Sequence, residues 1–447
     1  MTRLASAFRH FHPFTALVIG DFFFDTYITG RVKRISPEAP VPVLEVIKEE
    51  SRPGGAGNVA LNLAVLGARV FAIGRVGRDL EGELLKDRLV AAGVDVSALC
   101  FEPHYRTPVK RRFIADSQQL LRVDFEKVEP LSEAFEEEML SLLSSYIARA
   151  QVIAISDYAK GFLSKRLIQA VIEIAKKAKV PVIVDPKGTD FTKYRGASVL
   201  KPNLSEAYAA AKMTSAASLD DVAKSLLEAC AVDRLLITRS EAGISLFEQK
   251  GERADFPVQV KEVKDVTGAG DTVLSCICLA LANGLGMHEA AELANIGASI
   301  SIERLGCVQV TIAEMARRLL EKERDQKVFD ESHAPVLRHV LKDQRYCLLV
   351  LPNGQSIPNA LFRTVKELRE KYLVMVYIDD PKPRDEFIYL LSPLKGIDMI
   401  VLQKENLKDL CGCMEPQETY VLAEDGLKEM SQAANLLDRL RTVSAVP

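Results

Sequence analysis

The chain has 447 residues, of which 48% are hydrophobic and 27% are charged. This composition is typical of globular proteins and excludes a disordered or fibrous class. The 58 Lys and Arg nearly balance the 61 Asp and Glu, so no electrostatic argument favours a nucleic-acid or membrane partner. The length predicts one large α/β domain followed by a smaller one.

The termini and cysteines favour a cytoplasmic location. The N-terminus lacks the apolar run and cleavage site of a secretion signal, and no run reaches the ~18 apolar residues that a membrane span needs. The eight Cys lie mostly in apolar stretches, where a reduced thiol behaves as a small hydrophobe. Cys411 and Cys413 have no second ligand pair nearby, so we interpret them as thiols rather than zinc ligands.

Apolar strand-like runs alternate with helical segments over the first part of the chain. They cover residues 16–20, 69–77, 152–159, 180–186, 197–203 and 234–240. Nearly continuous hydrophobic strands separated by amphipathic helices are typical of a parallel sheet covered on both faces. Residues 1–320 are therefore predicted to form a doubly wound α/β domain.

Two segments, 29–49 and 105–125, instead alternate polar and apolar residues, which predicts exposed strands. A small sheet that projects from an α/β core can cover a ligand as a lid or pair with another subunit. We expect a β lid and a homodimer.

The charged stretch after residue 320 ends at Pro335 and predicts a linker over 321–340. Strand-like runs at 346–352, 372–380 and 397–403 follow. Residues 341–447 are predicted to form a small α/β domain.

The segment Gly268-Ala269-Gly270-Asp271 precedes a long apolar helical run. Small residues at a helix N-terminus let backbone N–H groups approach an anion closely, and the helix dipole adds positive charge. Asp271 is placed to accept the proton of a hydroxyl that attacks a phosphate. On spacing alone, the segment is equally a turn with an N-capping Asp.

A second glycine cluster, Gly54-Gly55, also opens an apolar helix. These glycines permit close backbone approach to a ligand, and Asn58 offers an amide for sugar hydroxyls. Taken alone, this cluster is equally an ordinary strand-to-helix turn.

Six motifs occur in order at the spacing of one known family: GDFFFD (20–25), RPGGAGNVA (52–60), DPKG (185–188), KPNLSE (201–206), TRSEAG (238–243) and DVTGAGDT (265–272). The chain resembles the ribokinase-like (PfkB) sugar kinases. More narrowly, RISPEAPVPVLEV (34–46), SDYAKGFL (156–163), DPKGTDFTKYRGA (185–197) and TRSEAGISL (238–246) resemble the heptose-7-phosphate 1-kinases.

The resemblance implies transfer of the ATP γ-phosphate to the anomeric hydroxyl of D-glycero-D-manno-heptose 7-phosphate. It implies ATP and Mg²⁺ as cofactors and leaves a monovalent-cation requirement open. Three alternatives stay open as well: a kinase of another sugar, sugar phosphate or nucleoside, a chain that also transfers an adenylyl group, and a non-catalytic regulator of the same fold.

The resemblance also implies roles for individual residues. Asp271 matches the catalytic base, and Gly268, Ala269 and Gly270 match the anion hole. The residues expected at the nucleotide are Asn203, Leu204, Ser205, Glu206, Thr238, Arg239, Ser240 and Gly243, with Asn203 and Glu206 helping to hold Mg²⁺. The residues expected at the sugar phosphate are Asp21, Asp25, Gly54, Gly55, Asn58, Lys110, Arg112, Asp157, Lys160 and Lys187, and Arg122 is a weaker candidate.

Each assignment has a plainer interpretation. Asn203 and Glu206 also fit a helix N-cap, Asp21 and Asp25 fit a solvated turn, and any single cation fits the surface.

In the related bifunctional enzymes a nucleotidyltransferase domain with an HxGH motif follows the kinase. Residues 349–362 here keep Asn353-Gly354 but contain no His. The histidines of this motif stabilise the phosphates of the nucleotide that is transferred. Without them, adenylyl transfer would lose electrostatic stabilisation, so the second domain is predicted to be degenerate and catalytically inactive.

Overall fold

The computed structural model describes the whole chain except residues 1–3, 5–7, 9–10, 116–117, 250–251, 259–261, 323–326, 353–357, 359, 404–409, 411–412, 424–425 and 431–447. The chain forms two compact units. One comprises Phe11–Thr311, and the other comprises Ile312–Pro447 together with Met1–His10.

The larger unit is built on one sheet with the strand order β12-β11-β10-β9-β8-β7-β1-β3-β4. The strands are β12 (Arg253–Phe256), β11 (Ile244–Glu248), β10 (Arg234–Thr238), β9 (Val199–Leu200), β8 (Val182–Asp185), β7 (Val152–Ser156), β1 (Phe14–Ile35), β3 (Ala68–Gly77) and β4 (Asp95–Glu102). Pairing is parallel from β10 to β4 and antiparallel at β11 and β12. The predicted doubly wound α/β class is confirmed.

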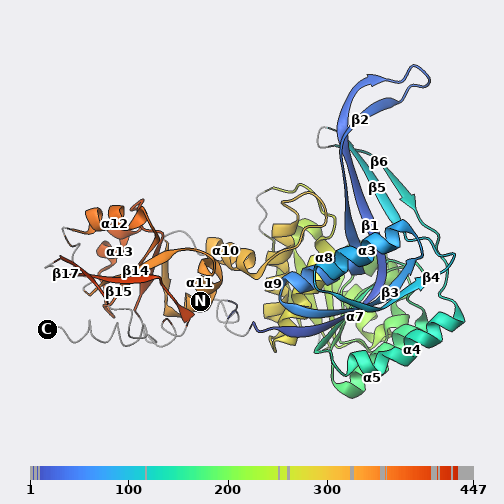
Figure 1. The fold of residues 1–447 in the computed structure, drawn as a ribbon. Helices are drawn as coiled ribbons and strands as arrows, with labels where there is room; N and C mark the ends of the chain where they lie inside the picture. Colours follow the sequence, from blue (N-terminus) through green and yellow to red (C-terminus); the bar gives the residue numbers. More distant parts are fainter. Residues whose placement is uncertain are drawn as a thin grey trace. The chain divides into compact units, whose positions relative to one another are not determined.

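Helices cover both faces of this sheet (Figure 1). They are α2 (Ala56–Val65), α3 (Leu80–Ala91), α4 (Glu133–Ile147), α5 (Lys165–Ala178), α6 (Leu204–Ala210), α7 (Leu219–Cys230), α8 (Ala269–Ala282) and α9 (Met287–Ser301). Leu143 of α4, Val171 of α5 and Leu226 of α7 share one buried cluster with strand residues such as Leu17 and Ile153. Because side chains alternate along a strand, the intervening residues face the other helical layer, which includes α2 and α8.

The lid is an extension of the central strand. Beyond the core, residues 22–35 of β1 pair antiparallel with β2 (Pro42–Gly55). Residues 24–30 pair parallel with β5 (Val109–Ala115), which pairs with β6 (Gln118–Phe125). These strands project from the core in Figure 1. The lid expected from alternation is thus present, and β2 also continues through Gly54-Gly55, where an ordinary strand-to-helix turn was one of two equal interpretations of the sequence.

The smaller unit is a six-stranded sheet in the order β13-β16-β15-β14-β17-β18. Its strands are β13 (Val328–Asp330), β16 (Met399–Leu402), β15 (Leu373–Ile378), β14 (Tyr346–Leu351), β17 (Glu418–Ala423) and β18 (Gly426–Glu429), with helices α10 (Ile312–Lys322), α11 (Ala334–Leu341), α12 (Leu361–Arg369) and α13 (Asp385–Leu391). Only β18 pairs antiparallel among these described strands. β13 and α11 fall within the range for which the sequence predicts a linker.

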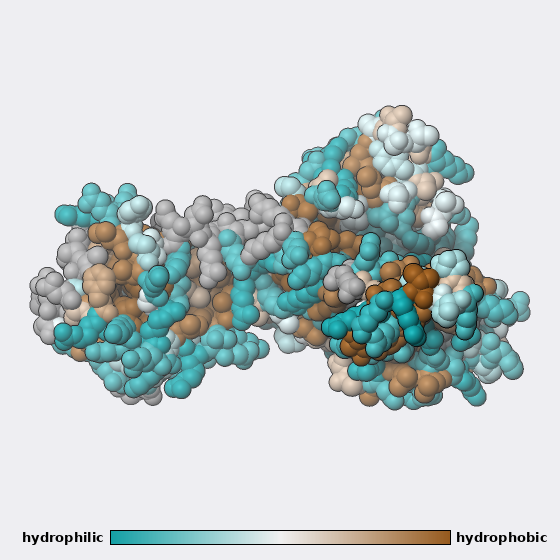
Figure 2. All heavy atoms as spheres, turned by 90° about the horizontal axis from the view of Figure 1, so that it is seen from above, coloured by the Kyte–Doolittle hydropathy of each residue, from teal (hydrophilic) through white to brown (hydrophobic). Residues whose placement is uncertain are grey.

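Hydrophilic side chains dominate the face drawn in Figure 2, and hydrophobic ones gather in separate patches. Among the described residues, no helix combines the length and the hydropathy needed to cross a membrane. Exposed aliphatic side chains include Ile35, Val46 and Ile47 of the lid.

Candidate active site

The first candidate residues lie where parallel strands end, at the edge where α/β sheets bind ligands. Asp21 follows the core part of β1 and is 3% exposed. Its Oδ2 accepts N–H hydrogen bonds from Tyr158 (2.8 Å) and Lys160 (3.1 Å). Its Oδ1 is buried and has no hydrogen-bond partner among the described residues. Burial, reinforced by the charge of Asp157, raises the pKa of Asp21 to about 6.

Asp271 lies in the first turn of α8 and is 1% exposed. Its Oδ2 accepts from Asn58 Nδ2 at 2.8 Å, and its Oδ1 accepts from the Tyr158 hydroxyl at 3.0 Å. Burial raises the pKa of Asp271 to about 7, although both hydrogen bonds act in the opposite direction. The carboxyl is therefore oriented from two sides and has the pKa of a general base that works near neutral pH.

The start of α8 has the form of an anion cradle. Gly268 is the N-cap, with φ of 80° and no side-chain cap. The Ala269 N–H donates to Val266 O at 3.2 Å, and the amides that follow in the first turn point toward the N-terminal end of the helix. A Cβ at Gly268 would lie 2.8 Å from Asn58 Nδ2. A Cβ at Gly270 would lie 3.5 Å from both Lys201 Nζ and Asp185 Oδ2. The glycines thus keep space at a helix N-terminus beside a buried cation.

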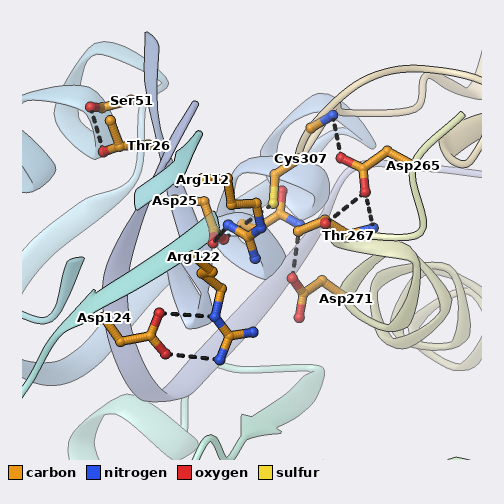
Figure 3. Close-up of polar contacts among 12 residues, drawn as sticks. Asp25, Thr26, Ser51, Arg112, Arg122, Asp124, Asp265, Thr267, Asp271 and Cys307 are labelled. Atoms are coloured by element: carbon orange, nitrogen blue, oxygen red, sulfur yellow. Dashed lines mark hydrogen bonds and ion pairs between the residues drawn. The ribbon is translucent and has the colours of Figure 1, made fainter. Parts of the chain in front are cut away.

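Asp25 is held by the lid and by a loop beyond α9. Arg112 of β5 donates to Asp25 Oδ1, and Cys307 Sγ lies 3.6 Å from Asp25 Oδ2. Figure 3 shows Arg112 and Cys307 both directed at Asp25. A Cβ at Gly54 would lie 2.4 Å from Asp25 Oδ2, so glycine is required for β2 to approach this carboxylate.

Lys110, also from β5, lies over aromatic rings. Its Nζ is 4.0 Å from the centre of the Phe23 ring and 5.0 Å from that of Tyr158. Burial lowers the pKa of Lys110. A desolvated ammonium on an aromatic surface next to Asp25 favours an anionic ligand.

Other predicted substrate residues are engaged elsewhere. Asp157 Oδ2 accepts from Lys193 Nζ and the Tyr194 hydroxyl, both at 2.7 Å. Lys160 Nζ lies 2.5 Å from Glu126 Oε2.

Arg122 pairs with Asp124 at 2.8 Å on the same strand, as Figure 3 shows. The structure therefore brings Asp21, Asp25, Asn58, Lys110, Arg112 and Asp271 together, and ties Asp157, Lys160 and Arg122 to protein partners.

A cavity of about 630 Å³ lies at the N-terminus of α8. Its lining combines apolar side chains with residues from β10, α8 and α9, and includes Thr238, Ser240, Gly243, Val263, Val266, Ala269, Gly270, Asn295 and Ile302. Three residues predicted to contact the nucleotide, Thr238, Ser240 and Gly243, line it. The Arg239 side chain instead lies 3.2 Å from Asp255 and donates to Ala242 O.

Asn203 and Glu206 form a capping box at the start of α6. Asn203 Oδ1 accepts from the Glu206 N–H (2.8 Å), and Glu206 Oε2 accepts from the Asn203 N–H (3.0 Å). Lys187 Nζ lies 2.6 Å from Glu206 Oε1. Asn203 and Glu206 therefore do cap this helix, as the plainer interpretation predicted. The same contacts hold the side-chain oxygens of both residues, which could ligate a metal ion, in fixed positions near the end of β9.

Residues 15–313 match the family model described as pfkB family carbohydrate kinase. The chain belongs to the pfkB family of carbohydrate kinases. Members transfer a phosphoryl group to a sugar hydroxyl.

Relatives of this pfkB chain include proteins named "Bifunctional protein HldE". The one from Geobacter metallireducens is 47% identical over 312 residues, which cover 69% of this chain and 64% of the relative. The one from Pelobacter propionicus is 41% identical over 95% of this chain and 90% of its own. The chain spans less than two thirds of the length of several relatives that match its kinase part.

Solved structures show the same fold for the pfkB part. Escherichia coli phosphofructokinase-2 in complex with potassium has a TM-score of 0.57 at 18% identity, covering 70% of this chain and 99% of that one. Arabidopsis thaliana ribokinase complexed with ribose and ATP has a TM-score of 0.54 at 19% identity, covering 69% and 99%.

Three residues at the pfkB site were not singled out from the sequence. Tyr158 contacts both Asp21 and Asp271, and Lys201 lies 3.0 Å from Asp185 beside the α8 cradle. In the structure Asp185 ends β8, Lys201 follows β9 directly and Tyr158 lies two residues after β7. Charged or phenolic residues near neighbouring strand ends are the signal that would have identified them.

Proposed function

We propose that the chain transfers the γ-phosphate of ATP to the anomeric hydroxyl of D-glycero-D-manno-heptose 7-phosphate. The observation that carries this proposal is Asp271, a buried carboxyl with a pKa of about 7 at the N-terminus of α8. It lies between a cavity of nucleotide size and a second set of buried carboxyl and cationic groups. The SDYAKGFL and PEAPVP segments favour a heptose phosphate among sugars.

In this proposal Asp271 removes the proton of the attacking hydroxyl. Asn58 and Tyr158 hold its two oxygens in place, each of which keeps a further lone pair for the substrate. Asp21 Oδ1, which has no hydrogen-bond partner among the described residues, accepts a hydrogen bond from a hydroxyl of the sugar. Positioning and charge neutralisation supply most of the acceleration in phosphoryl transfer.

The described residues fit MgATP. The α8 N-terminus and Lys201 suit phosphate oxygens, and the adjoining cavity has apolar walls for a base. Asn203 and Glu206 present the hard oxygen donors that suit Mg²⁺ with retained waters. The metal, when bound, neutralises charge on the transferring phosphate. A monovalent-cation requirement stays open.

The phosphate already on the substrate would lie at Lys110 and Arg112. Lys110 is desolvated on an aromatic surface, and Arg112 has donors left beside its bond to Asp25. Lys160 and Lys187 are paired with Glu126 and Glu206, so they would first have to exchange partners.

The test is an ADP-release assay with a panel of sugars and sugar phosphates, on wild type and Asp271→Asn. We expect heptose 7-phosphate to be preferred and Asp271→Asn to lose about 10³-fold in kcat while it still binds an ATP analogue. Asp95→Asn, on β4 and bonded to Ser97, is the matched control. Near-wild-type turnover by Asp271→Asn would exclude this base, and preference for an unphosphorylated sugar would exclude the phosphate site.

The lid supports the proposal of a homodimer. Ile35 and Ile47, on opposite strands of the β1–β2 arm, are 61% and 65% exposed. A second copy can cover both the apolar side chains and the strand edges. Sedimentation of wild type and Ile47→Glu tests this, and a monomeric wild type would contradict it.

The second unit is proposed to be catalytically inactive. Residues 349–362 contain no His, and Asn353-Gly354 lie outside the described residues. Incubation of the full chain with ATP and heptose 1-phosphate tests the point, because an ADP-heptose product would show a working adenylyltransferase.

A further inference from the structure

We propose that Tyr158 is a positioning residue that orients both the base Asp271 and the sugar-binding carboxylate Asp21. It contacts one through its side-chain hydroxyl and the other through its backbone N–H. Its N–H donates to Asp21 Oδ2 (2.8 Å) and its hydroxyl donates to Asp271 Oδ1 (3.0 Å). The inference rests on the proposed function, in which Asp271 removes the proton and Asp21 binds the sugar.

The backbone around Tyr158 is fixed by unusual conformations and by a buried cation. Ala159 and Gly161 have φ of 54° and 96°. A Cβ at Gly161 would lie 1.9 Å from Glu129 O, so only glycine fits there. Arg75, which is fully buried, donates to Lys160 O at 3.1 Å and to Glu129 O at 2.6 Å. The loop therefore presents the Tyr158 N–H to Asp21 in one orientation.

The ring of Tyr158 is fixed as well. It packs edge-to-face against Phe23, with ring centres 4.9 Å apart, and Lys110 Nζ lies 5.0 Å from its centre. Since Phe23 lies between Asp21 and Asp25 on β1, the same aromatic contact ties the tyrosine to the strand that carries both carboxylates. A phenylalanine at position 158 would keep this packing and lose only the hydroxyl.

The direction of the Tyr158–Asp271 hydrogen bond follows from burial. Burial raises the pKa of Tyr158 well above its usual range, so the phenol stays protonated and acts as the donor. A donor to a carboxylate favours the ionised form. The phenol thus partly offsets the burial that raises the pKa of Asp271.

Besides Tyr158, two ionisable groups shift the pKa of Asp271. Asp185 raises its pKa and Lys201 lowers it. Cys307, whose own pKa burial raises well above its usual range, stays a neutral thiol. None of these is altered directly by loss of the Tyr158 hydroxyl, so the effect of that loss on Asp271 can be measured separately.

The experiment is the pH dependence of kcat/KM for Tyr158→Phe in the full chain. Without the donor, the acid limb is expected to move to higher pH and kcat at pH 7 to fall about tenfold, with KM for ATP unchanged. Tyr208→Phe, which removes a hydroxyl that donates to Ala217 O, is the matched control and should leave the acid limb in place.

Incorporation of a difluorotyrosine at position 158 should shift the acid limb in the direction opposite to that expected for Tyr158→Phe. Its more acidic phenol is a stronger donor, so the acid limb is expected to move to lower pH while the ring packing is kept. An acid limb that stays in place in both forms would overturn the inference. If Asp271→Asn retains turnover, the proposed function itself fails, so the two failures are distinguishable.

Discussion

Lys201 Nζ lies 3.0 Å from Asp185 Oδ1, with side chains 3% and 15% exposed, next to Gly270 in the first turn of α8. Burying two charges costs desolvation energy, and their attraction repays it only while both are present. The pair also places a cation where a nucleotide phosphate would lie. The Lys201–Asp185 ion pair thus affects both the stability of the kinase unit and the positive charge at the proposed phosphate position.

Lys201→Met is expected to destabilise the kinase unit by about 3 kcal/mol, because Asp185 is left as an unpaired buried carboxylate. The double variant Lys201→Met/Asp185→Asn should recover most of that stability and still bind ATP weakly. Urea unfolding and titration with an ATP analogue measure the two effects. Equal loss of stability in the single and double variants would contradict the account.

The pH profile of turnover should have its acid limb near pH 7. Asp271 must be ionised to accept a proton, and burial raises its pKa to about 7. The rate constant kcat/KM is expected to fall about tenfold per pH unit below that value, and more steeply below pH 6, where Asp21 also becomes protonated. Initial rates across pH 5–9 measure it. A limb near pH 4 would show that an ordinary carboxyl controls the rate.

The same shift predicts how stability changes with pH. The folded-state pKa of Asp271 is about 7, above its ordinary value of 3.8, so the native state binds more protons than the unfolded state between these values. Its contribution to stability therefore falls as pH rises from about 4 to 7. Compared with wild type, Asp271→Asn should gain in melting temperature as pH rises through this window. A constant difference would exclude a raised pKa.

Two glycines with nearly the same backbone conformation allow a matched test of the cradle. Gly268 and Gly284 have φ of 80° and 75°. A Cβ at Gly284 meets nothing within 4 Å, whereas one at Gly268 would press on Asn58 Nδ2. Both Ala variants should lose about 1 kcal/mol of stability from the left-handed backbone conformation, and Gly268→Ala should lose more because its Cβ also presses on Asn58. Only Gly268→Ala should lower kcat, because Asn58 is displaced from Asp271, and equal activities would refute the steric argument.

Local sequence was enough to predict the elements whose signals are local. The apolar run at 16–20 predicted the core of β1, and Gly268 to Asp271 before an apolar run predicted the start of α8. The partners of Asp25 were not predictable in this way, because Arg112 and Cys307 lie 87 and 282 residues away. Likewise, nothing near Asp157 indicates that Lys193 and Tyr194 engage its carboxylate.

The lid illustrates the same limit. Alternation predicted exposed strands, but the apolar run at 16–20 predicted only the core of β1, and an ordinary strand-to-helix turn stayed an equal alternative at Gly54-Gly55. In the structure their pairing with each other (Phe22 with Gly55, Phe23 with Gly54) makes both segments strand. Cross-strand partners more than 30 residues apart determine these conformations, and single-segment patterns do not carry that information.

Because β1 continues without a break from the core into the lid, the number of residues in this strand is constrained as well as their identity. Asp21, Phe23, Asp25 and Tyr27 share one face because side chains alternate along a strand. Deleting or inserting one residue between Gly20 and Asp25 would turn every later side chain to the opposite face. Homologous chains should therefore accept substitutions in this stretch far more readily than changes in its number of residues.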